Sequence, residues 1–200
     1  TSNIGKFTNS GVKLHDAVKA IQGVSNVAAI SGANTQQASH AMYNFAQALS
    51  SGSVKLIDWK SIENANMATM EFKTELLKTA LALGTVKKKG DQYISTTKDQ
   101  RGKVSAAFNA TKNFNESLSS HWMTTEVLVQ TLGRYSDETT AIGKKAFAAA
   151  QDVKTFSQLM DTLKEAVGSG WSETFELIFG NFDEAKALWT EGSNAGRGVV

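Results

Sequence analysis

Apolar side chains recur at every third or fourth position over most of the chain, and this spacing places them on one face of a helix. In the first part of the chain the pattern predicts helices over residues 11–30, 34–50, 58–66 and 67–83. Further on it predicts helices over 109–119, 124–134 and 138–153, and one more that opens at Thr155. The predicted fold class is therefore mainly α, a compact multi-helix domain.

Polar residues and glycines mark the expected ends of these helices. Asn34 and Gln37 fit a capping box, in which each side chain binds the backbone N–H of the other residue. Gly84 fits a C-terminal stop. The other expected N-caps are Asp58, Thr124 and Asp137. Gly23 and Gly143 fall inside predicted helices, so glycine-broken helices are expected.

The helical pattern stops between residues 85 and 108. Lys87-Lys88-Lys89-Gly90 predicts a turn, and the β-prone run Tyr93–Thr97 follows it. After a second turn at 98–102, residues 103–108 are expected to pair back, which gives one small β-hairpin insertion. The resulting divisions are an N-terminal helical half (1–84), the β-hairpin insertion (85–108), a C-terminal helical half (109–191) and a flexible tail (192–200).

The longest apolar stripe lies in the C-terminal third, where steps of three and four residues run from Phe156 to Trp189. Its polar face is mainly acidic, which favours packing against protein over binding to an anionic membrane. The residues expected to make this interaction are Trp171, Phe175, Ile178, Phe182 and Trp189. The stripe slips at Gly168-Ser169-Gly170. We interpret the segment as two-state, either bent at its glycines or straightened to face sister chains.

Composition limits the function classes further. Two hundred residues with 41% apolar and 20% charged content suit a globular chain with a sizeable core. The net charge of +2 does not by itself imply a nucleic-acid or membrane partner. Cysteine and proline are absent, which excludes disulfides and thiolate chemistry and favours long helices. Because the sequence begins at Thr1 rather than at Met, we expect it to be a piece of a longer protein.

Candidate chemistry is sparse. The histidines His15, His40 and His121 lie far apart, without the neighbouring ligands that a metal site needs. No nucleophile elbow and no phosphate-binding glycine motif is present in the sequence. The helix dipole explains three carboxylate pairs near predicted helix starts, which are Asp137 with Glu138, Glu173 with Glu176, and Asp183 with Glu184. We therefore predict no catalytic, metal or cofactor site, no enzyme activity and no small-molecule ligand.

The hairpin is the strongly basic part of the chain. Three consecutive lysines precede Tyr93, and Lys98, Arg101 and Lys103 follow it. A basic, aromatic-bearing hairpin can bind nucleic acid, so a helical nucleic-acid-binding module is the alternative function. The other interpretation is a solvated turn whose charges deter edge pairing. The sequence favours this second interpretation, and nucleic acid is not the partner we expect.

A set of short blocks runs from about residue 31 to residue 190. In the first half these blocks are Gln47–Lys55, Asp58-Trp59 and Ile62–Ala65. In the second half they are Phe114–Leu118, Trp122–Thr124, Val127-Leu128, Thr131-Leu132, Thr139–Phe147, Val153–Ser157, Asp161–Glu165 and Gly170–Phe182, ending at Trp189. In their order and spacing the blocks resemble the tape measure domain of tail tape measure proteins from long-tailed phages and prophages.

The resemblance implies a structural protein of the virion tail, assembled in the cytoplasm of a bacterial host. Such proteins occupy the tail lumen, set tail length and template polymerisation of the tail tube. The implied partners are the tail tube protein, tail assembly chaperones, tail tip proteins and further copies of the chain, with membrane contact only during DNA ejection. The family has no active-site motif in this region, so no individual functional residue follows from the resemblance.

The size of a compact fold bears on this role. A compact domain of this length has a radius of gyration of roughly 16 Å and a diameter of about 40 Å. Several copies should not fit side by side within a narrow tail tube, whereas the same residues as one helix would span about 300 Å. We therefore expect a compact fold to be a pre-assembly or isolated-fragment state, or to lie at one end of the tube.

Overall fold

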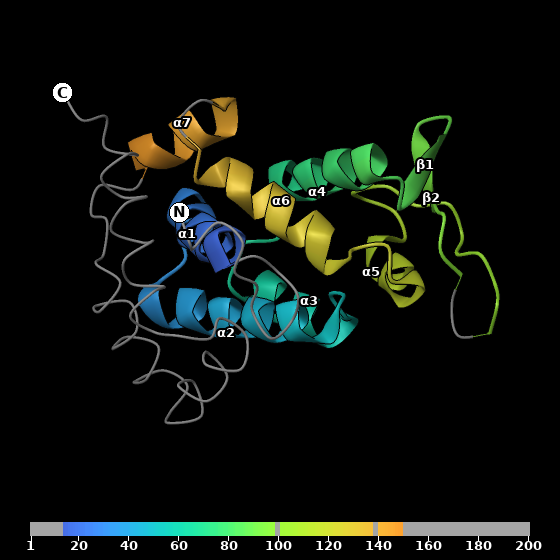
Figure 1. Cartoon of the computed structure of the whole chain (residues 1–200), viewed down its shortest axis with the longest axis horizontal. Coiled ribbons are helices and arrows are strands. Elements are labelled where there is room, and N and C mark those ends of the chain that lie inside the picture. Colours follow the sequence, from blue (N-terminus) through green and yellow to red (C-terminus); the bar gives the residue numbers. More distant parts are fainter. Residues whose placement is uncertain (1–13, 99–100, 138–139, 150–200) are drawn as a thin grey trace.

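The computed structural model describes residues 14–98, 101–137 and 140–149, and in them the chain is mainly α with one small antiparallel hairpin, as predicted (Figure 1). The first helices are α1 (Leu14–Ser31), α2 (Thr35–Ser51), α3 (Leu56–Asn64) and α4 (Met70–Leu83). The hairpin strands are β1 (Val86–Lys89) and β2 (Gln92–Ser95). After them come α5 (Phe114–Ser117), the 3-10 helix η1 (Leu118–Ser120), α6 (Thr125–Tyr135) and α7 (Ala141–Ala149). Among the described helices, none is both long and apolar enough to cross a membrane.

The centre of the fold is the crossing of α1 and α6, two helices far apart in the sequence. α2 and α7 also pack against α1, and α4 packs against α6 (Figure 1). Gly23 permits the crossing, because a Cβ at this position would lie 2.1 Å from the carbonyl oxygen of Leu132. The predicted break at Gly23 is therefore wrong: α1 continues through this glycine and uses it as the point of closest approach.

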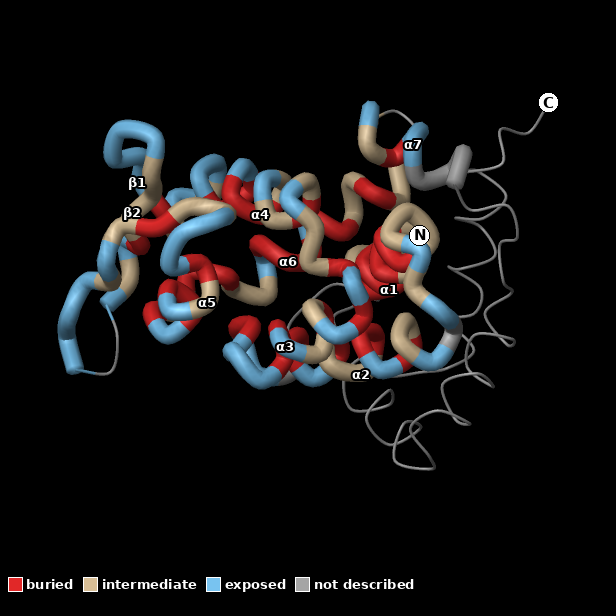
Figure 2. The backbone as a smooth tube through the Cα atoms, turned by 180° about the vertical axis from the view of Figure 1, so that it is seen from behind, coloured by how far each residue is buried: buried red, intermediate tan, exposed pale blue. Residues whose placement is uncertain are grey.

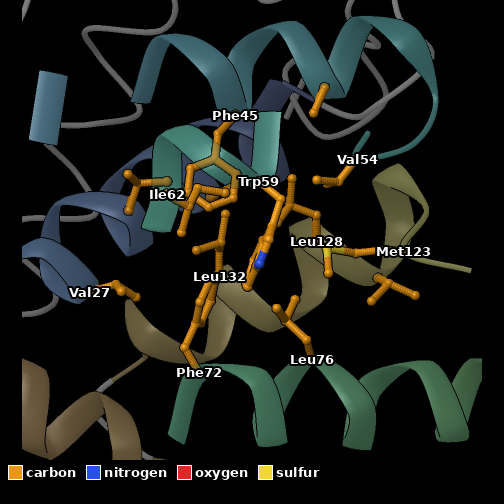
Figure 3. Packing of buried hydrophobic residues seen from close by; sticks show 14 of the residues in the cluster. Val27, Phe45, Val54, Trp59, Ile62, Phe72, Leu76, Met123, Leu128 and Leu132 are labelled. Carbon is orange, nitrogen blue, oxygen red and sulfur yellow. The ribbon is translucent and has the colours of Figure 1, made fainter. Parts of the chain in front are cut away.

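One hydrophobic cluster unites helices from both halves of the chain. Figure 2 shows that buried positions dominate α1 and recur along the elements that face it. Trp59 of α3 is fully buried in this cluster, with its ring stacked on Phe72 at 6.1 Å between centroids and tilted against Phe114 at 5.1 Å. Figure 3 shows Leu128 and Leu132 of α6 beside the rings of Trp59 and Phe72. Helices α3, α4, α5 and α6 therefore meet around Trp59.

Several predicted caps are confirmed. Asn34 and Gln37 form the capping box, in which the Gln37 N–H donates to Asn34 Oδ1 at 2.8 Å. The Thr124 hydroxyl caps α6, and Gly84 ends α4 in the left-handed conformation. Each of these caps depends on residues within one helical turn, so the sequence alone is sufficient to predict them.

Asp58 is not the N-cap that the sequence predicted. α3 begins at Leu56, and Asp58 lies within its first turn. The Asp58 carboxylate accepts a hydrogen bond from the Lys55 N–H at 3.1 Å, so it caps the helix from inside. The side chain is buried, and burial raises the pKa of this carboxyl above its ordinary value of 3.8, against the opposing effect of the Lys55 hydrogen bond.

We expect this raised pKa to make stability depend on pH. The folded chain holds the Asp58 proton at a higher pH than the unfolded chain does, so the stabilisation from protonation is complete below 3.8 and is lost as pH rises through the folded-state pKa. Asp58→Asn keeps an oxygen acceptor but cannot ionise. As pH rises from 3.5 to 7, the parent should therefore lose stability that the variant keeps, so the free energy of unfolding of the variant minus that of the parent should increase. Urea unfolding at several pH values measures this difference. A constant difference between the two proteins across this range would contradict the burial of a titrating carboxyl.

The predicted helix over 109–119 is much shorter in the structure, where it is reduced to α5 and η1. The Asn109 side chain accepts hydrogen bonds from the N–H groups of Thr111 and Lys112 at 2.9 and 2.8 Å. These bonds stabilise a turn, and they compete directly with the helix ladder. Asn113 then takes φ = +57°, which ends any continuation from the turn into a helix.

Two other helix starts are later than predicted. α4 begins three residues later because the Thr69 hydroxyl accepts the N–H of Phe72. α7 begins after Thr140, whose hydroxyl accepts the Gly143 N–H at 2.9 Å, so Thr140 takes the capping role that was predicted for Asp137. A Cβ at Gly143 would lie 1.7 Å from the Asp137 carbonyl oxygen, so this glycine is also a close contact rather than a break. The predicted end of this helix lies outside the described residues.

The hairpin pairs different segments from those predicted. β1 and β2 pair antiparallel, so the three consecutive lysines lie in a strand and not in a turn. The turn falls one step later, at Gly90-Asp91, where Gly90 takes φ = +65°. The predicted pairing with residues 103–108 is present as two single bridges, Tyr93 with Phe108 and Lys98 with Val104.

Candidate interaction surface

The interaction residues predicted from the sequence lie outside the described residues; they are Trp171, Phe175, Ile178, Phe182 and Trp189. The glycine join at 168–170 and the predicted flexible tail at 192–200 lie outside them as well. Packing of this stripe against protein or against sister chains therefore stays a prediction. The surfaces considered next belong to residues 14–149.

The structure describes the side chains of two of the three histidines, His40 and His121. His40 is exposed on α2 and lines a cavity of about 300 Å³ with Gln37, Ser61 and Asn64, which are uncharged. Within the described ranges, no group of three or more His, Cys, Asp or Glu side chains converges as a metal site requires. Besides His40, the lining offers amide and hydroxyl groups and no carboxylate.

His121 joins two segments that are distant in the sequence, because its Nδ1 lies 3.2 Å from Ser53 Oγ. The same segments share two backbone hydrogen bonds of 2.9 Å, from Val54 N–H to the Met123 oxygen and from Thr125 N–H to the Gly52 oxygen. A catalytic serine–histidine pair also needs a carboxylate that orients the imidazole. In the described part of the chain no carboxylate is hydrogen-bonded to His121, and the contact with Ser53 adds to the backbone bonds that join these two segments.

A polar network that the sequence did not predict joins α4 to α6. Arg134 donates to the Glu75 carboxylate at 3.0 Å and to Thr79 Oγ1 at 2.7 Å. Thr131 Oγ1 also donates to Thr79 Oγ1, at 2.7 Å, and both threonines are buried. Buried hydroxyls need such partners, so these groups are committed to the helix contact. The spacing of Thr131 and Arg134 on one helical face was a visible signal, but their partners on α4 could not be read from it.

A cluster of exposed basic side chains lies on the hairpin and the segment after it, which together we call the basic arm: β1, β2 and residues 96–98 and 101–104, with Lys87, Lys88, Lys89 and Lys98. The arm protrudes at one end of the molecule (Figure 1). All four lysines are exposed, and the Lys88 ammonium lies 5.3 Å from the ring centroid of Tyr93, a cation–π contact. Arg101 and Lys103 are also exposed on this arm.

The arm is tied firmly to the helices. Tyr93 and Phe108 exchange two backbone hydrogen bonds of 2.7 and 2.9 Å. At its base, Thr96 Oγ1 donates to the Gly84 oxygen at 2.7 Å, and Thr97 Oγ1 donates to the Ser120 oxygen. The lysines are therefore presented on an ordered support whose own hydrogen bonds do not involve them.

Basic residues are concentrated in one segment of the chain, which the net charge of +2 does not reveal. The whole sequence holds 21 basic and 19 acidic residues. Residues 86–104, which span the basic arm, hold six of the basic residues and only two of the acidic ones, which leaves 15 basic and 17 acidic residues elsewhere. The small positive total is thus the sum of a strongly basic arm and a mildly acidic remainder.

No protein-family model, curated protein or solved structure matches this chain. Two features of the described residues bear on function: the paired segments around Ser53 and Thr124, and the basic arm. The first joins two distant segments of the fold, and the second presents exposed basic side chains.

Proposed function

We propose that the chain is a structural segment of a phage or prophage tail tape measure protein, which sets tail length and templates assembly of the tail tube from within its lumen. The observation that carries the proposal is where the blocks that resemble this family lie in the fold. Ser53 and Val54 of one block pair with the backbone of Thr124 and Met123 in another. These two blocks, far apart in the sequence, thus meet in the fold.

The side chains in these blocks support the same conclusion. Trp59 and Trp122, one from each half, are fully buried. Ile62, Leu128 and Leu132 are buried with them in one cluster. Core positions of this kind fix the shape of a fold and carry no chemistry of their own, which suits a structural protein of the tail.

The compact fold is then a state that precedes assembly, or one that lies at an end of the tube. A globule about 40 Å across would block a narrow lumen in several copies, whereas the same chain as a helix would extend about 300 Å. The proposed partners are the tail tube protein, tail assembly chaperones, tail tip proteins and sister chains, with the C-terminal aromatic stripe as the surface for packing. The proposed location is the virion tail, after assembly in the host cytoplasm, with membrane contact only during DNA ejection.

Genetics in the phage or prophage that encodes the chain tests the assignment. A stop codon placed early in the gene should give particles without tails of the normal length in electron micrographs, because the template for the tube is lost. The intact gene supplied in trans is the control and should restore them. Normal tails of normal length from the interrupted gene would overturn the proposal.

An in-frame deletion of residues 14–149 separates the two placements. If this segment is extended along the lumen, the tail should shorten by about 200 Å, at 1.5 Å per helical residue. If it remains a globule at one end of the tube, tail length should stay the same while assembly or infectivity falls. A deletion that changes neither tail length, assembly nor infectivity would contradict a structural role for this segment.

A further inference from the structure

We propose that the basic arm binds the phosphate backbone of double-stranded DNA, without reading base sequence. The inference stands apart from the tail assignment, since it rests only on the placement of the lysines in β1 and on the fact that no described carboxylate pairs with them. The sequence favoured a solvated turn at these residues. The structure instead places them in a paired strand, and this changes what they can do.

Consecutive residues of a strand point to opposite faces of the ribbon. Lys87 and Lys89 therefore share one face, about 6.8 Å apart at 3.4 Å per residue, and Lys88 lies on the other face beside Tyr93. The major groove of B-DNA admits a two-stranded β-ribbon between two phosphate walls. A narrow ribbon with lysines on both faces can place ammonium groups against both walls at once.

The fold does not use the charges of Lys87, Lys88, Lys89 and Lys98 in ion pairs among the described residues. The strands are held by backbone hydrogen bonds and by the buried side chains of Val86 and Ser95. One or two lysines are enough to deter edge pairing, and adjacent like charges repel one another. Three in succession are better explained by an external anion.

The chemistry of the arm favours a duplex backbone over bases or single strands. Single-strand binders stack bases on exposed aromatic rings. On this arm the Tyr93 ring packs towards Phe108 at 6.4 Å between centroids, and Lys88 lies over it, so no open stacking platform remains. Lysine contacts to phosphate position a protein on DNA without specifying sequence. The regular spacing of phosphates along a duplex matches a row of lysines on a rigid strand.

Fluorescence anisotropy with the full chain and a labelled duplex of about 20 base pairs tests the inference. We expect binding at 50 mM salt that weakens with added salt at a slope of about −3 to −4 in log K against log salt, as four phosphate contacts predict. The triple variant Lys87→Gln, Lys88→Gln, Lys89→Gln should bind about tenfold more weakly or worse, with a slope near −1. Its thermal unfolding should match the parent's, because these side chains do not support the fold.

The matched control removes the same charge elsewhere, with Lys19→Gln, Lys60→Gln and Lys144→Gln on α1, α3 and α7. This variant should keep the parent's affinity and slope. Absence of duplex binding at 50 mM salt, or equal losses in the two triple variants, would overturn the proposal. Polyglutamate that competes as well as unlabelled duplex would assign the arm to acidic protein instead, and tighter binding to a single strand of the same length would exclude the groove geometry.

Discussion

Replacing Gly23 with alanine should lower the free energy of unfolding by about 3 kcal/mol or more, at the upper end of what overpacked cores show. A Cβ there would lie 2.1 Å from the carbonyl oxygen of Leu132 and 2.7 Å from its carbonyl carbon. Backbone atoms cannot rotate away as a side chain can, so α1 and α6 would have to separate and their shared cluster would lose contacts. The intrinsic helix advantage of alanine, about 1 kcal/mol, is too small to offset this.

Gly133 in α6 provides the matched control. Nothing lies within 4 Å of a Cβ at this position, so Gly133→Ala should raise the free energy of unfolding by about 0.5–1 kcal/mol from helix propensity. Urea unfolding followed by far-ultraviolet circular dichroism measures both variants. The two glycine-to-alanine changes should thus move the urea concentration at the midpoint of unfolding in opposite directions. A Gly23→Ala protein as stable as the parent would mean that α1 and α6 do not cross at this glycine.

Trp59→Ala should cost about 3–5 kcal/mol of stability, as large-to-small changes of buried aromatic residues do. The Trp59 ring lies between Phe72 of α4 and Phe114 of α5 and is fully buried. Because its neighbours belong to different elements, the space left by its removal cannot close through a small shift of one helix. Urea unfolding of this variant gives the loss directly, and a cost below about 1 kcal/mol would place Trp59 outside the core.

Phenylalanine variants separate the packing of each tryptophan from its N–H group. Trp59 Nε1 has no hydrogen-bond partner among the described residues, whereas Trp122 Nε1 donates to Ser117 Oγ at 2.8 Å. Trp59→Phe and Trp122→Phe remove similar volume, but only the second removes a hydrogen bond. Trp122→Phe should therefore cost about 1 kcal/mol more. Equal costs would contradict the pairing of Trp122 with Ser117.

Local features of the fold were predictable from the sequence, because they depend on a few neighbouring residues. The capping box of Asn34 and Gln37, the Thr124 cap and the Gly84 stop are of this kind. Asp58 was misplaced by three positions because a carboxylate can cap a helix from outside or from within its first turn, and only the fold selects between them.

Features that depend on tertiary contacts were not predictable in the same way. Gly23 and Gly143 were interpreted as breaks, since a glycine in a helical pattern costs stability unless another backbone passes close to it. The α4–α6 network was missed because Thr79 and Arg134 are brought together only by helix packing. For the basic arm, the sequence identified the right residues but placed the turn before Gly90-Asp91 and so put the lysines in the wrong conformation.

The crossing of α1 and α6 also sets the order of events during translation. Gly23 and Leu132 are separated by more than 100 residues, so the apolar face of α1 leaves the ribosome long before its main partner does. At about 5–20 residues per second, the interval is on the order of 5–20 s. Throughout that time α1 can pack only against α2, and the part of its apolar face that α6 covers in the finished fold stays exposed to water.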